Sequence, residues 1–220
     1  LALQGIAAIA TGGTLLIGAT EHPSVREPAL AMQSRGWQVD VLAVDACGAI
    51  DAAGLAAAFQ GPVRWVSVML ANNETGVLQD LQPVAEAARR AGAVLHTDAV
   101  QAAGKVALDF AASGAQLMSL SAHKLNGPKG VGALLVDKRL ELAPLLRGGG
   151  QERGRRAGTE NVAGIVGFGV AARLAHERLA AQAAMLRRLR DRLEQGLMTL
   201  GGVEIFARDA GRLPNTVSFA

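Results

Sequence analysis

Six short apolar runs, rich in β-branched residues, recur along the chain and are separated by segments of helical character. They are TLLIGA (14–19), VDVLAV (39–44), VRWVSVMLA (63–71), AVLHTDA (93–99), QLMSLSA (116–122) and VGALLVD (131–137). Most are apolar on both faces, which is typical of strands in a sheet covered on both sides. The repeated order of strand, helix and strand predicts an α/β fold with a mostly parallel central sheet.

The segments between these runs carry helix signals. PSVREPALAMQSRG is followed by a helix stop at Gly36, and AAGLAAAF predicts an ordinary helix. In DLQPVAEAARRAG, Pro83 suits a first helical turn and Gly92 suits the position just after the last one. Helices therefore fill the intervals between the predicted strands.

The pattern changes after RGGGQERGRRAGTENV. Residues 162–200 predict one long helix with a soft interruption at GFG (167–169), and GGVEIF and PNTVSFA then predict two new strands. We therefore expect a large domain over residues 1–175, lacking its N-terminal part, and a truncated start of a smaller α+β domain over residues 176–220.

Composition excludes several classes of function. A formal charge of +3 is too small to imply a nucleic-acid partner, and the arginines of 187–192 alternate with leucines as on the wet face of an amphipathic helix. A single cysteine, Cys47, excludes an internal disulfide and a multi-cysteine metal site, and we expect no metal. No apolar run reaches the roughly 18 residues of a membrane span and no signal peptide is visible, so we expect a cytoplasmic protein without a membrane partner.

Polar residues gather where the predicted strands end, in ATEHPSV, MLANNETG, HTDAVQ and SAHK. Ligands of open parallel sheets bind at the carboxyl ends of the strands. Each residue also has an ordinary explanation: Asp98 can cap a helix, Asn72 and Asn73 are common turn formers, and His22 before Pro23 can begin a helix. Together, however, an acid, an amide, a histidine and a lysine would meet at one sheet edge.

The stretch SLSAHKLNGPKGVGALLV (119–136) places Lys124 at the end of a strand that we expect to be buried. A buried lysine is costly unless it has a partner or a task, and the lowered pKa that burial produces suits an amine that reacts with an aldehyde. A carboxylate such as Asp98 would keep a pyridine nitrogen protonated, and Ser121 and His123 could hold a phosphate. These are the parts needed to hold an aromatic aldehyde cofactor.

Four stretches in order carry a specific resemblance: MLANNETGVLQDL, VLHTDAVQAAGKVALD, SLSAHKLNGPKGVGALLV and RGGGQERGRRAGTENV. They resemble the cysteine desulfurases, in the class V aminotransferase family of fold-type I pyridoxal 5'-phosphate (PLP) enzymes. The similarity runs from LALQGIAA to LPNTVSF, and GGGQERG…GTEN is closer to the iron–sulfur cluster and nitrogenase-assembly group than to the selenocysteine-lyase-like group. The resemblance implies a three-layer sandwich around a mostly parallel sheet.

The resemblance assigns roles around the cofactor ring. Lys124 matches the catalytic lysine that carries PLP, Asp98 the carboxylate facing the pyridine nitrogen, and Gln101 the amide at the phenolic oxygen. His22 matches the histidine that stacks on the ring and takes part in proton transfer, and Asn73 matches an asparagine near the cofactor and the substrate carboxylate.

Three further matches concern the phosphate. Ser121 and His123 match phosphate ligands, and Thr159 matches a ligand contributed by the other subunit of a homodimer. The reaction implied is the conversion of L-cysteine to L-alanine. An enzyme thiolate would take the sulfur as a persulfide and pass it to a scaffold protein, for iron–sulfur cluster or other sulfur-cofactor assembly.

Some parts of the family pattern are not in this sequence. The catalytic cysteine and the arginine that binds the substrate carboxylate are expected beyond Ala220, and a phosphate loop is expected before LALQGIAA. Cys47 lies where the family has no catalytic cysteine, and we interpret it as a plain loop thiol. Ala122 and Ala157 replace other small residues without removing a cofactor contact. We expect the intact protein to be active and these 220 residues alone to retain the cofactor weakly.

Three alternatives remain open at this point. One is another enzyme of the same fold, such as a selenocysteine lyase or a small-amino-acid aminotransferase. Another is an inactive paralogue that serves as a scaffold for sulfur carriers, although a scaffold has no use for a Schiff-base lysine. The third is nucleic-acid binding, which depends only on the small excess of basic over acidic residues.

Overall fold

The computed structural model describes residues 1–10 and 12–220. Its six strands form one sheet in the order β2-β1-β3-β4-β5-β6, and every neighbouring pair is parallel except β5 and β6. The predicted α/β fold with a mostly parallel sheet is therefore confirmed. The strands are β1 (Gly13–Gly18), β2 (Trp37–Leu42), β3 (Val63–Ser67), β4 (Val94–Asp98), β5 (Leu117–Ser121) and β6 (Gly132–Val136).

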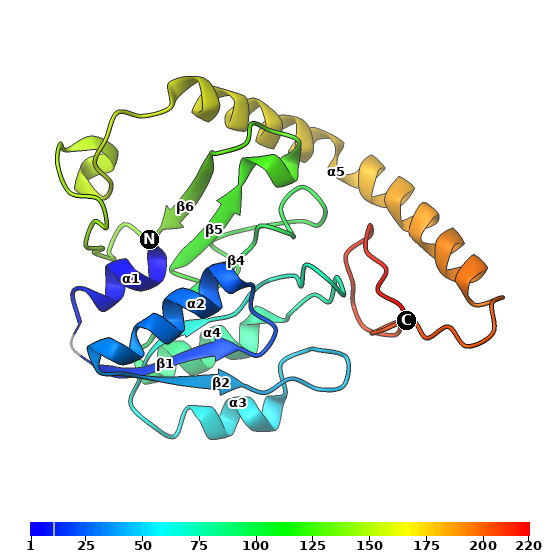
Figure 1. Ribbon diagram of the computed structural model, residues 1–220, viewed down its shortest axis with the longest axis horizontal. Helices are drawn as coiled ribbons and strands as arrows, with labels where there is room; N and C mark the ends of the chain where they lie inside the picture. The colour runs from blue at the N-terminus through cyan, green and yellow to red at the C-terminus, as the bar shows by residue number, and fades with distance from the viewer. Residues whose placement is uncertain (11) are drawn as a thin grey trace.

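Helices cover both faces of this sheet (Figure 1). Successive side chains of a strand point to opposite faces, so neighbouring residues of β1 enter different cores. Leu15 and Ile17 pack with α1 (Ala2–Ala7) and α2 (Pro23–Ala31), whereas Leu16 packs with α3 (Ala52–Ala58) and α4 (Leu81–Ala91). The result is the expected three-layer sandwich, with the strand buried between two apolar layers.

The helix ends follow their local sequence closely. The Asp80 side chain accepts the N–H of Gln82 at the start of α4, and Gly92 ends this helix in the left-handed conformation, with φ 66°. The helix predicted before Gly36 is shorter than expected. It ends at Ala31, and a 3₁₀ turn, η1 (Gln33–Arg35), continues to Gly36, as is frequent at helix ends.

The long helix α5 (Val162–Leu197) is unbroken, so the interruption predicted at GFG is wrong. Its glycines instead allow the helix to pack closely against neighbouring side chains. A Cβ atom at Gly164 would lie 2.4 Å from the side chain of Val131, and one at Gly167 would lie 2.6 Å from Pro128. The helix approaches the loop before β6 closely, and this packing offsets the roughly 1 kcal/mol by which glycine disfavours a helix.

The chain after α5 contains no regular strand, and the two strands predicted there are wrong. Strand-like pairing over 198–220 is limited to two isolated antiparallel bridges, between Ile205 and Phe219 and between Arg212 and Val77. Two short strands without further partners are marginal in water, which explains why the pairing does not extend beyond single bridges. The domain boundary predicted after residue 175 falls inside α5 and stays a prediction.

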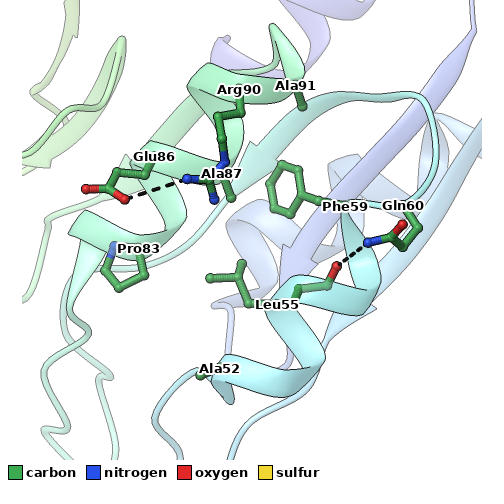
Figure 2. Close-up of a pocket in the computed structure, with 10 residues that line it drawn as sticks. Ala52, Leu55, Phe59, Gln60, Pro83, Glu86, Ala87, Arg90 and Ala91 are labelled. Atoms are coloured by element: carbon green, nitrogen blue, oxygen red, sulfur yellow. Dashed lines mark hydrogen bonds and ion pairs between the residues drawn. The ribbon is translucent and has the colours of Figure 1, made fainter.

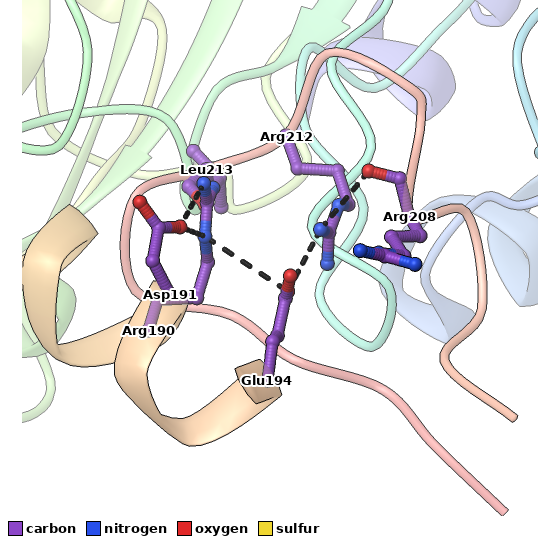
Figure 3. Close-up of polar contacts among 6 residues, drawn as sticks. All are labelled: Arg190, Asp191, Glu194, Arg208, Arg212 and Leu213. Atoms are coloured by element: carbon purple, nitrogen blue, oxygen red, sulfur yellow. Dashed lines mark hydrogen bonds and ion pairs between the residues drawn. The ribbon is translucent and has the colours of Figure 1, made fainter. Parts of the chain in front are cut away.

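A buried ion pair fastens this last segment to α5 (Figure 3). A guanidinium nitrogen of Arg212 lies 2.7 Å from the Glu194 carboxylate, and the two side chains are only 3% and 11% exposed. Arg190 of α5 also donates to the backbone carbonyl of Leu213 at 3.0 Å. Because both charges of the pair are withdrawn from water, each depends on the other.

The same segment also pairs with the loop between β3 and α4. Leu78 N–H donates to the carbonyl of Gly211 and Leu213 N–H donates to that of Gly76, both at 2.8 Å. A Cβ at Gly76 would lie 2.7 Å from Thr216, and the φ of 76° also favours glycine there. Residues 211–216 therefore connect α5 to a loop at the edge of the sheet.

In residues 1–10 and 12–220, no helix combines the length and the apolar character that crossing a membrane requires.

Replacement of Glu194 by alanine is expected to lower the free energy of unfolding by about 3 kcal/mol, because it leaves the Arg212 charge buried without a counter-ion. Chemical denaturation measures the loss. The matched control is Glu177→Ala, which breaks an exposed pair with Arg173 on the same helix and is expected to cost at most about 0.5 kcal/mol. Equal losses in the two variants would contradict the role given to the buried pair.

Candidate functional site

The loops after β1, β3, β4 and β5 leave the same edge of the sheet, because these strands are parallel to one another. The sequence-predicted residues His22, Asn73, Asp98, Gln101, Ser121, His123 and Lys124 lie at these strand ends or in the loops that follow them. The structure thus brings seven of the eight predicted site residues to one edge. Thr159 is the exception.

Asp98 is the last residue of β4 and is 8% exposed. Its Oδ1 accepts the N–H of Val100 at 2.9 Å, so it does cap the turn after the strand. Burial raises the pKa of this carboxyl, whereas the hydrogen bond from Val100 opposes the rise. A cation placed against this carboxylate would be bound favourably.

His22 begins α2 as its N-cap residue and is exposed. Its Nδ1 accepts the N–H of Ser24 at 3.1 Å and lies 2.8 Å from the Ser24 hydroxyl oxygen. A neutral imidazole whose Nδ1 is an acceptor carries its proton on Nε2. The capping role and a functional role are therefore compatible, because they use different ring nitrogens.

Glu21, beside His22, is a buried carboxyl that sequence reasoning missed. One carboxylate oxygen accepts the N–H of Met69, and the other has no hydrogen-bond partner among the described residues. Burial is the main reason why the pKa of Glu21 rises to about 8, and the charge of Asp98 adds to the rise. Its place in ATEHPSV, directly after a strand and next to a candidate histidine, was the available signal.

The two asparagines of MLANNETG have different surroundings. Asn72 is buried: its Oδ1 accepts the N–H groups of Glu74 and Thr75 at 2.9 Å, and its Nδ2 donates to the carbonyl of Thr20 at 3.2 Å. It therefore builds the turn and joins it to the loop that carries His22. Asn73 is exposed on the same turn.

Lys124 is exposed, and the expectation that it is buried is wrong. The strand β5 ends at Ser121, and the lysine lies beyond it on a 3₁₀ turn, η2 (Ala122–Leu125), which extends past the covered part of the sheet. The Ser121 hydroxyl oxygen lies 2.7 Å from Nδ1 of His123, so these two side chains pair with each other. Their role as phosphate ligands stays a prediction.

A pocket of about 340 Å³ opens beside Lys124, between η2, the turn after β4 and α5. Lys105, Lys124 and Arg178 line it, and no acidic side chain does so among the described residues. Lys105 donates to Oε1 and to the backbone carbonyl of Gln101, both at 2.9 Å. Burial, followed by the like charge of Lys124, lowers the pKa of Lys105 to about 8. Sequence reasoning did not single out Lys105.

Thr159 lies elsewhere, exposed in the loop between η3 (Gln151–Gly154) and α5. It lines a groove of about 600 Å³ along β6, together with arginines 153, 155 and 156. The structure does not bring it to Lys124, because the two residues line different pockets.

Two other features involve none of the predicted site residues. A groove of about 510 Å³ separates α3 from α4, and Figure 2 shows Leu55 and Phe59 on one side of it, facing the ion pair of Glu86 and Arg90 on the other. None of the predicted site residues lines it. Cys47 belongs to a turn after β2, where its N–H donates to Asp45 at 2.8 Å.

The raised pKa of Glu21 has a consequence for stability. The folded state binds this proton more tightly than the unfolded chain, in which the pKa is near 4.5. The contribution of this bound proton to the free energy of unfolding is therefore complete below pH 4.5. It is lost as the pH rises through about 8.

Glu21→Gln keeps the acceptor for Met69 and removes the titration. Between pH 5 and pH 8.5 the variant is expected to gain roughly 2–4 kcal/mol of unfolding free energy relative to the wild type. Urea denaturation at the two pH values measures this gain. Glu27→Gln, at an exposed position on α2, is the control and should show no relative gain. Parallel pH profiles for Glu21→Gln and the wild type would refute the assignment.

Comparison with known proteins places the chain in a family. All of residues 1–220 match the family described as Aminotransferase class-V. A cysteine desulfurase of Bradyrhizobium diazoefficiens is 48% identical over 200 residues, which cover 91% of this chain and 51% of the relative. The cysteine desulfurase NifS of Azotobacter vinelandii is 44% identical over 208 residues, which cover 94% and 52%. The chain thus spans about half the length of these curated relatives.

Solved structures agree with this placement. A NifS-like protein is 35% identical with a TM-score of 0.95, over 100% of this chain and 61% of its own. The NifS-like protein from Rickettsia africae is 30% identical with a TM-score of 0.90, over 99% and 59%. The fold is that of the fold-type I PLP enzymes, and the family generally uses PLP. The chain therefore belongs to the class-V aminotransferase family, and its relatives at 44–48% identity are cysteine desulfurases, as its motifs indicate.

Proposed function

We propose that the protein containing this chain is a PLP-dependent cysteine desulfurase. It converts L-cysteine to L-alanine and passes the sulfur as an enzyme persulfide to an acceptor or scaffold protein, for iron–sulfur cluster or other sulfur-cofactor assembly. The observation that carries the proposal is the convergence of Lys124, Asp98, Gln101 and His22 at one sheet edge, in a chain 48% identical to a cysteine desulfurase.

The chemistry of this set of side chains fits PLP. The Lys124 amine is accessible to an aldehyde and opens onto the pocket beside it. The buried Asp98 carboxylate, whose charge is disfavoured by burial, would gain a partner in a protonated ring nitrogen. When bound, PLP supplies an electron sink that stabilises negative charge on the α-carbon of the substrate.

Each side chain at this edge of the sheet would have its own role in the reaction. Lys124 would hold the cofactor and, once released by the substrate, move a proton at Nζ. His22 would present its Nε2–H to the ring, since Nδ1 is occupied by Ser24. Gln101 would face the phenolic oxygen, and Asn73 the substrate carboxylate. Ser121 and His123 would hold the phosphate.

The proposal extends to features outside this edge. We assign Thr159 to the phosphate of the other subunit in a homodimer, which its exposed position apart from Lys124 supports. We assign the persulfide cysteine to a part of the protein outside residues 1–220, because Cys47 lies in the turn after β2, where the family pattern has no catalytic cysteine. A protein of 30% identity and TM-score 0.85, described as SspA in complex with cysteine, supports the choice of substrate. The cytoplasmic location expected from the sequence stays a prediction.

Visible absorbance tests the cofactor assignment. The purified protein loaded with PLP is expected to be yellow, and borohydride reduction should fix the cofactor covalently to Lys124, as peptide mass spectrometry would show. Lys124→Ala should lose the covalent mark, whereas Lys129→Ala, at an exposed position in the same loop, should keep it. A colourless wild type after PLP addition would rule out the site assignment.

Sulfide release tests the activity. The full-length protein with L-cysteine and a reductant is expected to release sulfide and alanine in equal amounts, and Lys124→Ala should lower the rate at least about 100-fold, because the amine both holds the cofactor and transfers protons. Parallel assays with L-selenocysteine separate desulfurase from selenocysteine lyase. A wild type that binds PLP but releases no sulfide would favour an aminotransferase or an inactive scaffold.

A further inference from the structure

Lys105 contacts both oxygens of a single residue, Gln101, four positions earlier in the turn after β4. Its Nζ lies 2.9 Å from the side-chain Oε1 and 2.9 Å from the backbone carbonyl oxygen. An ammonium has only donors, so it can bond to the oxygen of the amide but not to its nitrogen. The contact therefore selects one of the two orientations of the Gln101 amide.

This selection matters because the two ends of an amide have the same shape and opposite hydrogen-bonding character. With Oε1 held by Lys105, the Nε2 group is the end left to donate elsewhere. Without Lys105, a rotation by half a turn would present an acceptor in its place. A negatively charged oxygen on a ligand would be stabilised by the first orientation and repelled by the second.

The turn that carries Lys105 is held tightly against η2. Gly104 has a φ of 72°, and a Cβ atom there would lie 2.5 Å from Leu125 and 3.2 Å from Ala175. Lys105 consequently lies in the pocket beside Lys124 and close to a like charge, which disfavours its own charge. Its two bonds to Gln101 are the hydrogen bonds that hold its Nζ in this place.

We propose that Lys105 is a positioning residue, which holds the Gln101 amide with Oε1 turned toward itself and Nε2 turned toward the phenolic oxygen of the cofactor. The inference rests on the proposed function, because it needs PLP at this edge of the sheet. It assigns to Lys105 no contact with substrate.

The test uses the full-length protein loaded with PLP and follows the visible band as a function of pH. A donor at the phenolic oxygen favours the more negative form of the cofactor and so lowers the pH midpoint of the colour change. Lys105→Met keeps the length of the side chain but has no donor. It should raise the midpoint by about 0.5 pH units and weaken PLP binding about threefold to tenfold. Lys105→Arg retains a donor and should restore much of the effect.

A double-mutant cycle with Gln101→Leu separates positioning from other roles. If Lys105 acts through Gln101, adding Lys105→Met to Gln101→Leu should move the midpoint no further. An equal shift in both backgrounds would show that Lys105 acts by its charge alone, and would overturn the proposal. Lys138→Met, at an exposed position after β6, is the control and should match the wild type.

The outcomes distinguish this inference from the proposed function. A wild type with no visible band would overturn the proposed function and, with it, the role of Lys105. A normal wild-type band together with an unchanged band in Lys105→Met would overturn only the positioning role.

Discussion

The arrangement of the candidate site depends on parallel strand pairing. The neighbours β1, β3, β4 and β5 run in one direction, so each delivers its following loop to the same edge of the sheet. Parallel pairing in turn requires helical crossovers, and these bury both faces of the sheet. The apolar residues of β1 illustrate this, since Leu15 and Leu16 enter cores on opposite faces. The polar residues are thereby concentrated where the covered strands end.

Hydrogen bonds between loops then fix the side chains at this edge. Glu21 binds the backbone of Met69, and Asn72 donates to the backbone of Thr20, so the loops after β1 and β3 are joined in two places. His22 directly follows Glu21 in the first of these loops. One of its ring nitrogens already accepts a hydrogen bond as the N-cap of α2. Residues 211–213 form backbone hydrogen bonds with the loop after β3. The buried ion pair of Arg212 and Glu194 joins these residues in turn to α5. Elements far apart in sequence thus support one short loop.

Local sequence patterns were sufficient for much of the fold and for part of the site. The six strands and the caps of α4 follow from apolar runs and from residues such as Asp80 and Gly92, because such signals act over a few residues. Predictions that depended on distant neighbours were less successful. The GFG segment continues as a helix because Pro128 packs against it, and the strands expected after α5 lack a further partner strand.

The sequence by itself determined the order of the strands along the chain and the chemical set at their ends: lysine, aspartate, amide and histidine. The tertiary structure decided the environment of each group, because burial depends on which segments cover a residue. It exposes Lys124 on a turn beyond the sheet and buries Glu21, whose partner Met69 is 48 residues away. It also places Lys105 beside Lys124 and turns the Gln101 amide, since only the folded chain brings these side chains together.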